Sequence, residues 1–89
     1  MVEAELVIRN VQGLHVRAAG LFVRVAGKFQ SEISVSRDDK EVNGKSILGV
    51  IDLAAESGST IRVRAVGPDE QAAVTALREL VDGKFGEET

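Results

Sequence analysis

The 89-residue sequence contains no cysteine, tryptophan or tyrosine, and it has one histidine and one proline. Without cysteine, the chain can form no disulfide, no thiolate zinc site and no iron–sulfur cluster, and it has no thiol nucleophile. A single histidine cannot build a multi-histidine metal site. We therefore expect a domain stabilised by apolar burial alone, with no metal and no cofactor.

Basic and aromatic residues are scarce as well. The formal net charge is −3, and aromatic residues make up 3% of the chain. A nucleic-acid-binding domain usually carries a basic surface, and single-stranded bases stack on aromatic side chains. An RNA-binding α/β domain is therefore the interpretation that the composition supports least, and we expect no nucleic-acid partner.

Long apolar runs are absent too. The longest cover residues 18–23 and 47–51, and Arg24 and Asp52 end them. A bilayer-spanning helix needs about 20 apolar residues. A signal peptide would begin with basic residues, whereas this chain has Glu3. We expect a soluble, cytoplasmic protein that does not insert into membranes.

The remaining composition is that of one folded domain, with 44% hydrophobic and 28% charged residues. A chain of this length has room for one hydrophobic core, so we expect a single domain over residues 1–89. The acidic end, residues 86–89, is expected to be a frayed tail.

Alternation of apolar and polar residues predicts four strands. The period of two is clear over residues 2–8, 32–36 and 61–65. A shorter strand begins at Glu41 and stops at the Asn43-Gly44 turn signal.

A helical period predicts three helices. The first runs from Val16 to a stop at Gly27, and the second covers residues 47–53 with Ser46 as its N-cap. The third follows Gly67, with Pro68 expected at its first helical position. Its apolar stripe consists of Ala73, Val74, Leu77, Leu80 and Val81, after which Gly83 ends the helix and Phe85 folds back.

The resulting order, β-α-β-β-α-β-α, predicts an α+β fold in which a four-stranded antiparallel sheet carries three helices on one face. The first six elements also match a ferredoxin-like βαββαβ unit. The short middle helix and the full helix after the fourth strand speak against that alternative.

One nucleotide-binding motif is excluded. Gly44-Lys45-Ser46 looks like the end of a phosphate-binding P-loop, but that motif needs a glycine where the chain has Asp39.

The segment Gly13-Leu14-His15-Val16-Arg17 is the first candidate for chemistry. His15 is expected at a loop-to-helix junction, exposed and beside unpaired backbone N–H groups. Histidine is mostly uncharged at pH 7, so one ring nitrogen has a free lone pair. The N–H groups and Arg17 would hold an anionic group placed on that ring. From the residues alone, the favoured interpretation is a polar capping role for His15 and a solvated charge for Arg17.

The segment from Asn43 to Val50 is the second candidate. Its plain interpretation is a hairpin end followed by a serine-capped helix. Ile47, Leu48 and Ile51 cannot all face inward on so short a helix, so an exposed apolar patch is expected, as docking surfaces often show.

Together these segments resemble the histidine-containing phosphocarrier (HPr/NPr) family of the bacterial phosphoenolpyruvate-dependent phosphotransferase system. The resemblance covers the whole chain and implies an open-faced β-sandwich. It implies a monomeric carrier and not an enzyme. His15 would take a phosphoryl group on Nδ1 from enzyme I and pass it to enzyme IIA domains, and Arg17 would stabilise that group. The implied partner-binding residues are Val16, Gly20, Arg24, Gly27, Ile47, Leu48, Gly49 and Ile51.

Ser46 matches the family's regulatory serine, which a bifunctional HPr kinase/phosphorylase modifies. A phosphate there would add negative charge to the docking surface without unfolding the helix. The family commonly has Ala-Arg-Pro after the histidine, whereas this chain has Val16-Arg17-Ala18. Because alanine is an excellent helix former, we expect the local geometry to survive. The alternative is a mainly regulatory module of the nitrogen-related NPr branch.

Overall fold

The computed structural model describes all 89 residues as one antiparallel sheet, three α-helices and a terminal 3₁₀ turn. Along the chain these are β1 (Val2–Val7), α1 (Val16–Ala26), β2 (Glu32–Arg37), β3 (Lys40–Asn43), α2 (Ile47–Asp52), β4 (Thr60–Val66), α3 (Glu70–Asp82) and η1 (Lys84–Gly86). None of the helices has the length and apolar character needed to cross a membrane.

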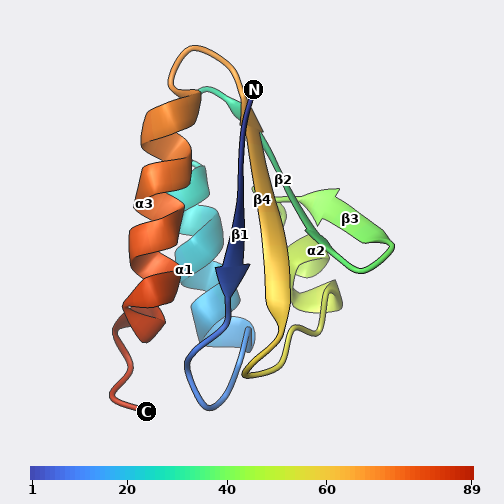
Figure 1. The fold of residues 1–89 in the computed structure, drawn as a ribbon, viewed down its shortest axis with the longest axis vertical. Coiled ribbons are helices and arrows are strands. Elements are labelled where there is room, and N and C mark those ends of the chain that lie inside the picture. The colour runs from blue at the N-terminus through green and yellow to red at the C-terminus, as the bar shows by residue number, and fades with distance from the viewer.

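The strand order in the sheet is β1-β4-β2-β3, so the last strand in the sequence lies between the first two. All three pairings are antiparallel. The helices cover one face of this sheet and leave the other face open (Figure 1). The predicted open-faced sandwich is therefore confirmed.

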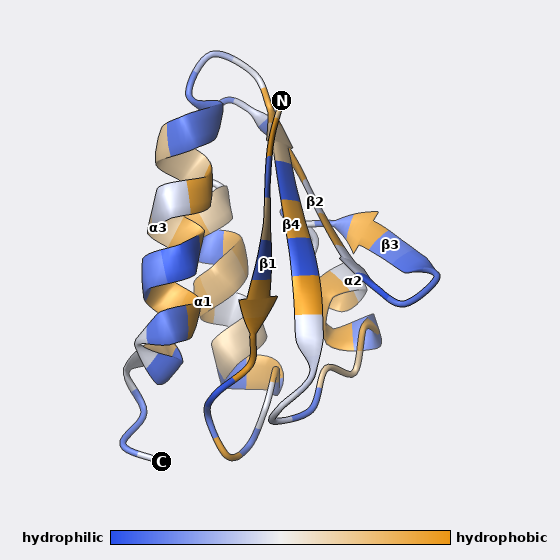
Figure 2. Ribbon diagram, in the orientation of Figure 1, coloured by the Kyte–Doolittle hydropathy of each residue, from blue (hydrophilic) through white to orange (hydrophobic).

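The core lies between the sheet and the helices. Register places Leu6 of β1 opposite Ile61 of β4, and Val35 of β2 opposite Val63 of β4. All four side chains are buried. Phe22 of α1 is completely buried among them, and Figure 2 shows hydrophobic and hydrophilic residues alternating along β4. The alternation read from the sequence thus reflects real burial on one side of the sheet.

The start of α3 differs from the expectation. Pro68 lies in the turn before the helix, Asp69 is the N-cap, and the helix begins at Glu70. The Asp69 carboxylate does not cap the helix, because its oxygens accept hydrogen bonds from the backbone N–H groups of Gln30 and Ser31 at 2.8 and 2.9 Å. This long-range contact holds the residue in a non-helical conformation.

The C-terminal residues fold back against the loop that precedes α1. Phe85 folds back as predicted and is 4% exposed. Lys84, Phe85 and Gly86 all have left-handed backbones, with φ of 58°, 55° and 79°. The chain therefore reverses after α3, and the N–H of Val11 donates to the carbonyl of Thr89 at 3.1 Å. Burial of Phe85 offsets the cost of two left-handed non-glycine residues.

Candidate functional site

His15 is the N-cap residue of α1. Its backbone is extended, and its carbonyl oxygen accepts the N–H of Ala19 at 2.8 Å. The N–H groups of Val16, Arg17 and Ala18 precede that bond and have no acceptor within the helix. Such N–H groups at a helix N-terminus favour anions. The structure thus places His15 at the predicted junction, with donors ready for phosphate-like oxygens.

The loop before His15 is fixed against the segment that follows α2. The N–H of Leu14 donates to the carbonyl of Ala55 at 2.9 Å, and Leu14 is buried. Gly13 has a φ of 71°, and a Cβ atom there would lie 2.7 Å from the Ala55 oxygen. Only glycine fits this position, so the close approach of the loop before His15 to Ala55 depends on Gly13.

The imidazole ring is less open than expected, because the C-terminal segment covers part of it. Nε2 of His15 lies 2.6 Å from Oε2 of Glu87, and the His15 side chain is 24% exposed. No hydrogen bond involves Nδ1. One nitrogen of the ring is therefore engaged, while the other is free.

Glu87 is held from both sides. Its Oε1 accepts a hydrogen bond from Nδ2 of Asn10 at 3.0 Å, while its Oε2 faces His15. The hydrogen bonds with His15 and Asn10, and the nearby charge of Arg17, hold the pKa of the Glu87 carboxyl below its usual value. Glu87 is thus an anion beside the ring.

Arg17 lies on the exposed side of α1 and forms no hydrogen bond or ion pair. It lies two residues after His15, in the first turn of the helix. A guanidinium without partners is free to bind an anionic group on His15. The residue after it, Ala18, is completely buried in the first turn. The helix keeps its expected start at Val16 without the proline common in the family.

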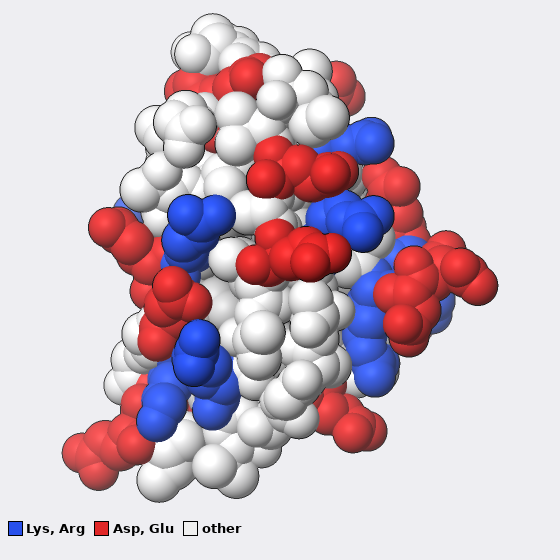
Figure 3. Space-filling view, viewed as in Figure 1, with Lys and Arg blue, Asp and Glu red and all other residues white.

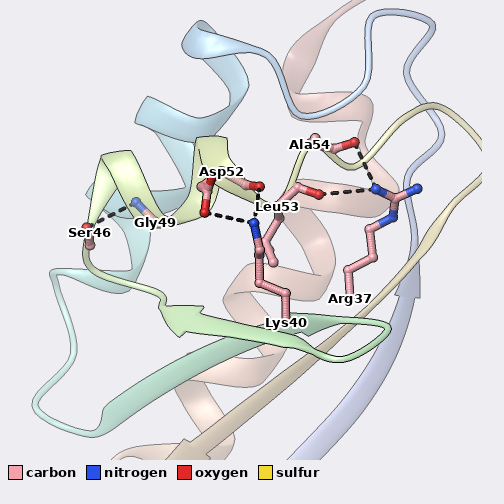
Figure 4. A network of polar contacts seen from close by, with 7 residues as sticks. All are labelled: Arg37, Lys40, Ser46, Gly49, Asp52, Leu53 and Ala54. Carbon is pink, nitrogen blue, oxygen red and sulfur yellow. Dashed lines mark hydrogen bonds and ion pairs between the residues drawn. The ribbon is translucent and has the colours of Figure 1, made fainter.

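Ser46 is the N-cap of α2, as predicted. Its hydroxyl accepts a hydrogen bond from the N–H of Gly49 at 3.2 Å (Figure 4). The other end of this short helix is held by Arg37, which donates to the carbonyls of Leu53 and Ala54 at 3.2 and 3.1 Å. Cation donors at the carbonyl end also suit the helix dipole. Six helical residues are therefore fixed at both ends by side chains.

A second support joins α2 to the sheet. Nζ of Lys40 in β3 lies 2.9 Å from Oδ2 of Asp52, the last residue of the helix (Figure 4). Both side chains are more than half exposed, so this ion pair adds little stability. It orients the end of α2 against the β2–β3 hairpin.

The exposed sides of α1 and α2 form one surface. Ile47 is 41% exposed and Leu48 is 77% exposed, whereas Ile51 is half-buried and packs on the core. A Cβ atom on Gly20 would lie 3.8 Å from Cδ1 of Ile47, so the two helices adjoin there. We call this surface the α1–α2 face; its residues are Val16, Gly20, Arg24, Gly27, Ile47, Leu48, Gly49 and Ile51.

Two polar residues of the site were not found from the sequence. The sequence pattern predicts a turn at Asn10, after the first strand, and a polar tail at Glu87. No local pattern connects them, because their contact joins residues 77 positions apart. The one usable signal was Phe85, whose burial brings the following residues back toward α1.

Comparison with known proteins places these features in a family. The family model described as "PTS HPr component phosphorylation site" matches residues 2–82. Phosphocarrier protein HPr of Xylella fastidiosa strain 9a5c is 48% identical over 89 residues, covering all of both chains.

Two solved structures from Thermoanaerobacter tengcongensis agree. A crystal structure of HPr-C-His superposes with a TM-score of 0.96 at 46% identity, covering all of both chains. A crystal structure of an HPr dimer has a TM-score of 0.79 at 46% identity, covering 98% of this chain and 100% of that one.

Proposed function

This chain belongs to the HPr family of phosphocarrier proteins of the phosphotransferase system, and we propose that it carries a phosphoryl group on Nδ1 of His15. The group would come from phosphorylated enzyme I and pass to a histidine of an enzyme IIA domain. The observation that carries this proposal is the free Nδ1 of a ring whose other nitrogen is engaged by Glu87.

The chemistry follows from the surroundings of His15. As the bond between phosphorus and enzyme I breaks, the Nδ1 lone pair forms a new P–N bond. The phosphoryl oxygens then find the unpaired N–H groups at the start of α1 and the free guanidinium of Arg17. Neither contact is covalent, so the group is stabilised without being trapped. The same bond breaks when an enzyme IIA histidine attacks.

The protein acts in this scheme as a carrier and not as an enzyme, because its own histidine is consumed and regenerated by its partners. The α1–α2 face is the proposed docking surface for both partners. It borders His15, which begins α1, and it exposes Leu48 and Val16 as apolar anchors. Since one chain contains both the histidine and this face, we propose that a monomer is the working form, in the cytoplasm.

Regulation at Ser46 is the second function we propose. Ser46 lies at the start of α2 beside Ile47 and Leu48. A phosphate placed there by an HPr kinase/phosphorylase would put two negative charges next to the apolar part of the docking face. If control of this kind is the main role, the protein is a regulatory module of the NPr type.

The experiment is phosphorylation of the purified protein with enzyme I and labelled phosphoenolpyruvate. We expect an acid-labile, alkali-stable label that is absent from His15→Ala and present in Ser46→Ala. Failure of several enzymes I to label the folded protein would overturn the carrier role. For regulation, ATP and an HPr kinase should add an acid-stable label that Ser46→Ala loses.

A further inference from the structure

A chain of three hydrogen bonds connects the backbone of the His15 loop to the imidazole ring. Nδ2 of Asn10 donates to the carbonyl of Gly13 at 2.7 Å and to Oε1 of Glu87 at 3.0 Å. Oε2 of Glu87 lies 2.6 Å from Nε2 of His15. Asn10 is completely buried, so its amide has one orientation set by the Gly13 carbonyl.

The donor and acceptor directions in these three hydrogen bonds determine which ring nitrogen of His15 carries the proton. Both amide hydrogens of Asn10 are donated. A rotation of the amide group by half a turn would put the oxygen in place of the nitrogen and lose both hydrogen bonds. The ionised Glu87 has acceptors only. Nε2 of His15 must therefore be the donor, and a neutral ring then has an unprotonated Nδ1.

We propose that Glu87 is a positioning residue that holds His15 in the Nε2–H tautomer and so presents the Nδ1 lone pair for phosphoryl transfer. The inference rests on the proposed carrier function and deepens it. Because Nδ1 has no proton, no base is needed when the P–N bond forms.

Glu87 also favours the product of the transfer. The phosphorylated ring has phosphorus on Nδ1 and a proton on Nε2, and it is therefore a cation. The Glu87 carboxylate faces that proton, so it stabilises the cation and keeps Nε2 protonated. Arg17, whose charge reaches Glu87, and Glu56, which lines the depression beside His15, are the other charged groups around the ring.

The C-terminal segment is built to keep Glu87 in place. Phe85, two residues before it, is buried in the core, and Thr89, two residues after it, accepts the N–H of Val11. The side chain of Glu87 is 11% exposed. Contacts on both sides of Glu87 therefore hold the segment in place, and they fix the position of the carboxylate beside His15.

Glu87→Gln tests the proposal, because it should reverse the tautomer. Only the amide oxygen of glutamine can accept from Asn10, which turns its NH₂ group toward Nε2. That NH₂ needs a lone pair on Nε2, so the ring proton moves to Nδ1. The ¹⁵N chemical shifts of the ring, measured on the free protein near pH 8, should show Nε2–H in the wild type and a shift toward Nδ1–H in Glu87→Gln. Glu88→Gln, which removes the same charge from an exposed residue without hydrogen bonds, should match the wild type.

The rate of labelling by enzyme I gives a second measurement. A hydrogen-bond partner that fixes the ring of a metal-bound histidine is worth about 10- to 100-fold in activity, and we expect Glu87→Gln to slow labelling by a similar factor and Glu88→Gln not to. Glu87→Ala serves as a second variant. Its loss of labelling rate should lie between those of Glu87→Gln and Glu88→Gln. Unchanged ring shifts and an unchanged rate in Glu87→Gln would overturn the proposal. If instead the wild type shows Nε2–H but no enzyme I labels it, the carrier function fails while the tautomer assignment stands.

Discussion

The hydroxyl of Ser46 accepts the N–H of Gly49 at 3.2 Å, so the residue proposed for regulation also caps the helix of the docking face. Ser46→Ala should lower the free energy of unfolding by about 1 kcal/mol, because it leaves that N–H without its partner. Ser46→Asp should keep the cap and the stability. Urea unfolding of the three proteins checks this, and an alanine variant as stable as the wild type would contradict it.

Leu48 should contribute to partner binding and not to stability. It is 77% exposed on the α1–α2 face, so Leu48→Ala should change the free energy of unfolding by no more than about 0.5 kcal/mol. Binding to enzyme I should weaken by about 1 kcal/mol or more if Leu48 is an anchor. Calorimetry measures this. Val66→Ala on β4, where the side chain is 46% exposed, is the matched control and should bind normally.

Arg17 should matter for transfer alone. Because it makes no hydrogen bond in the folded protein, Arg17→Ala should leave the unfolding curve unchanged. A charge-assisted hydrogen bond to the phosphoryl group is worth about 1.5–3 kcal/mol, which predicts labelling slowed about 10- to 100-fold. Arg78→Ala on the exposed side of α3 is the control in the same rapid-quench assay. Equal rates for the two variants would remove Arg17 from the site.

Gly13 and Gly58 both have left-handed backbones, but only Gly13 is crowded by neighbouring atoms. Substitutions at the two positions therefore distinguish the cost of backbone strain from the cost of a steric clash. Their φ values are 71° and 89°, but a Cβ at Gly13 would lie 2.7 Å from the Ala55 oxygen, whereas nothing lies within 4 Å at Gly58. Gly58→Ala should cost about 1 kcal/mol of stability, and Gly13→Ala clearly more. Thermal unfolding compares them. Gly13→Ala should also slow labelling, because it moves the start of α1.

Asp69 should make stability depend on acid. The hydrogen bond from the Ser31 hydroxyl has the largest effect and, with that from the Gln30 N–H, lowers the pKa of the Asp69 carboxyl in the folded protein. The unfolded chain therefore binds protons at a higher pH, so the contribution of Asp69 is complete above its usual pKa. It is lost as the pH falls through the lower, folded value. Unfolding measured below about pH 5 should show a shallower slope for Asp69→Asn, and an unchanged slope would contradict the assignment.

The fold could be predicted from the sequence where one face of an element is buried. The alternation over residues 2–8 and 61–65 becomes two paired strands whose inner side chains lie in the core. The same holds for α1, whose predicted start at Val16 is the observed one. In these segments burial imposes a period that the sequence must display.

The rest depends on contacts between distant residues. Pro68 suits a helix start, but Asp69 is engaged by Ser31, and the helix begins later. The polar composition of the acidic end gives no sign of a contact, but Glu87 binds a residue 72 positions away. No periodicity reports such a contact. The sequence therefore predicts the places of His15 and Ser46 at the starts of two helices, but not the carboxylate that faces the ring.

The sheet surface without helices offers a place to attach probes. Register brings Glu3 opposite Arg64 and Glu5 opposite Arg62, and charged groups of both signs lie on this side of the molecule (Figure 3). His15 caps the start of α1, and both α1 and α2 belong to the helical layer on the other face of the sheet. We therefore expect a fluorophore or a surface linker, coupled through a cysteine introduced at Glu3 on this open face, to leave phosphoryl exchange undisturbed, which makes single-molecule and immobilised assays practicable.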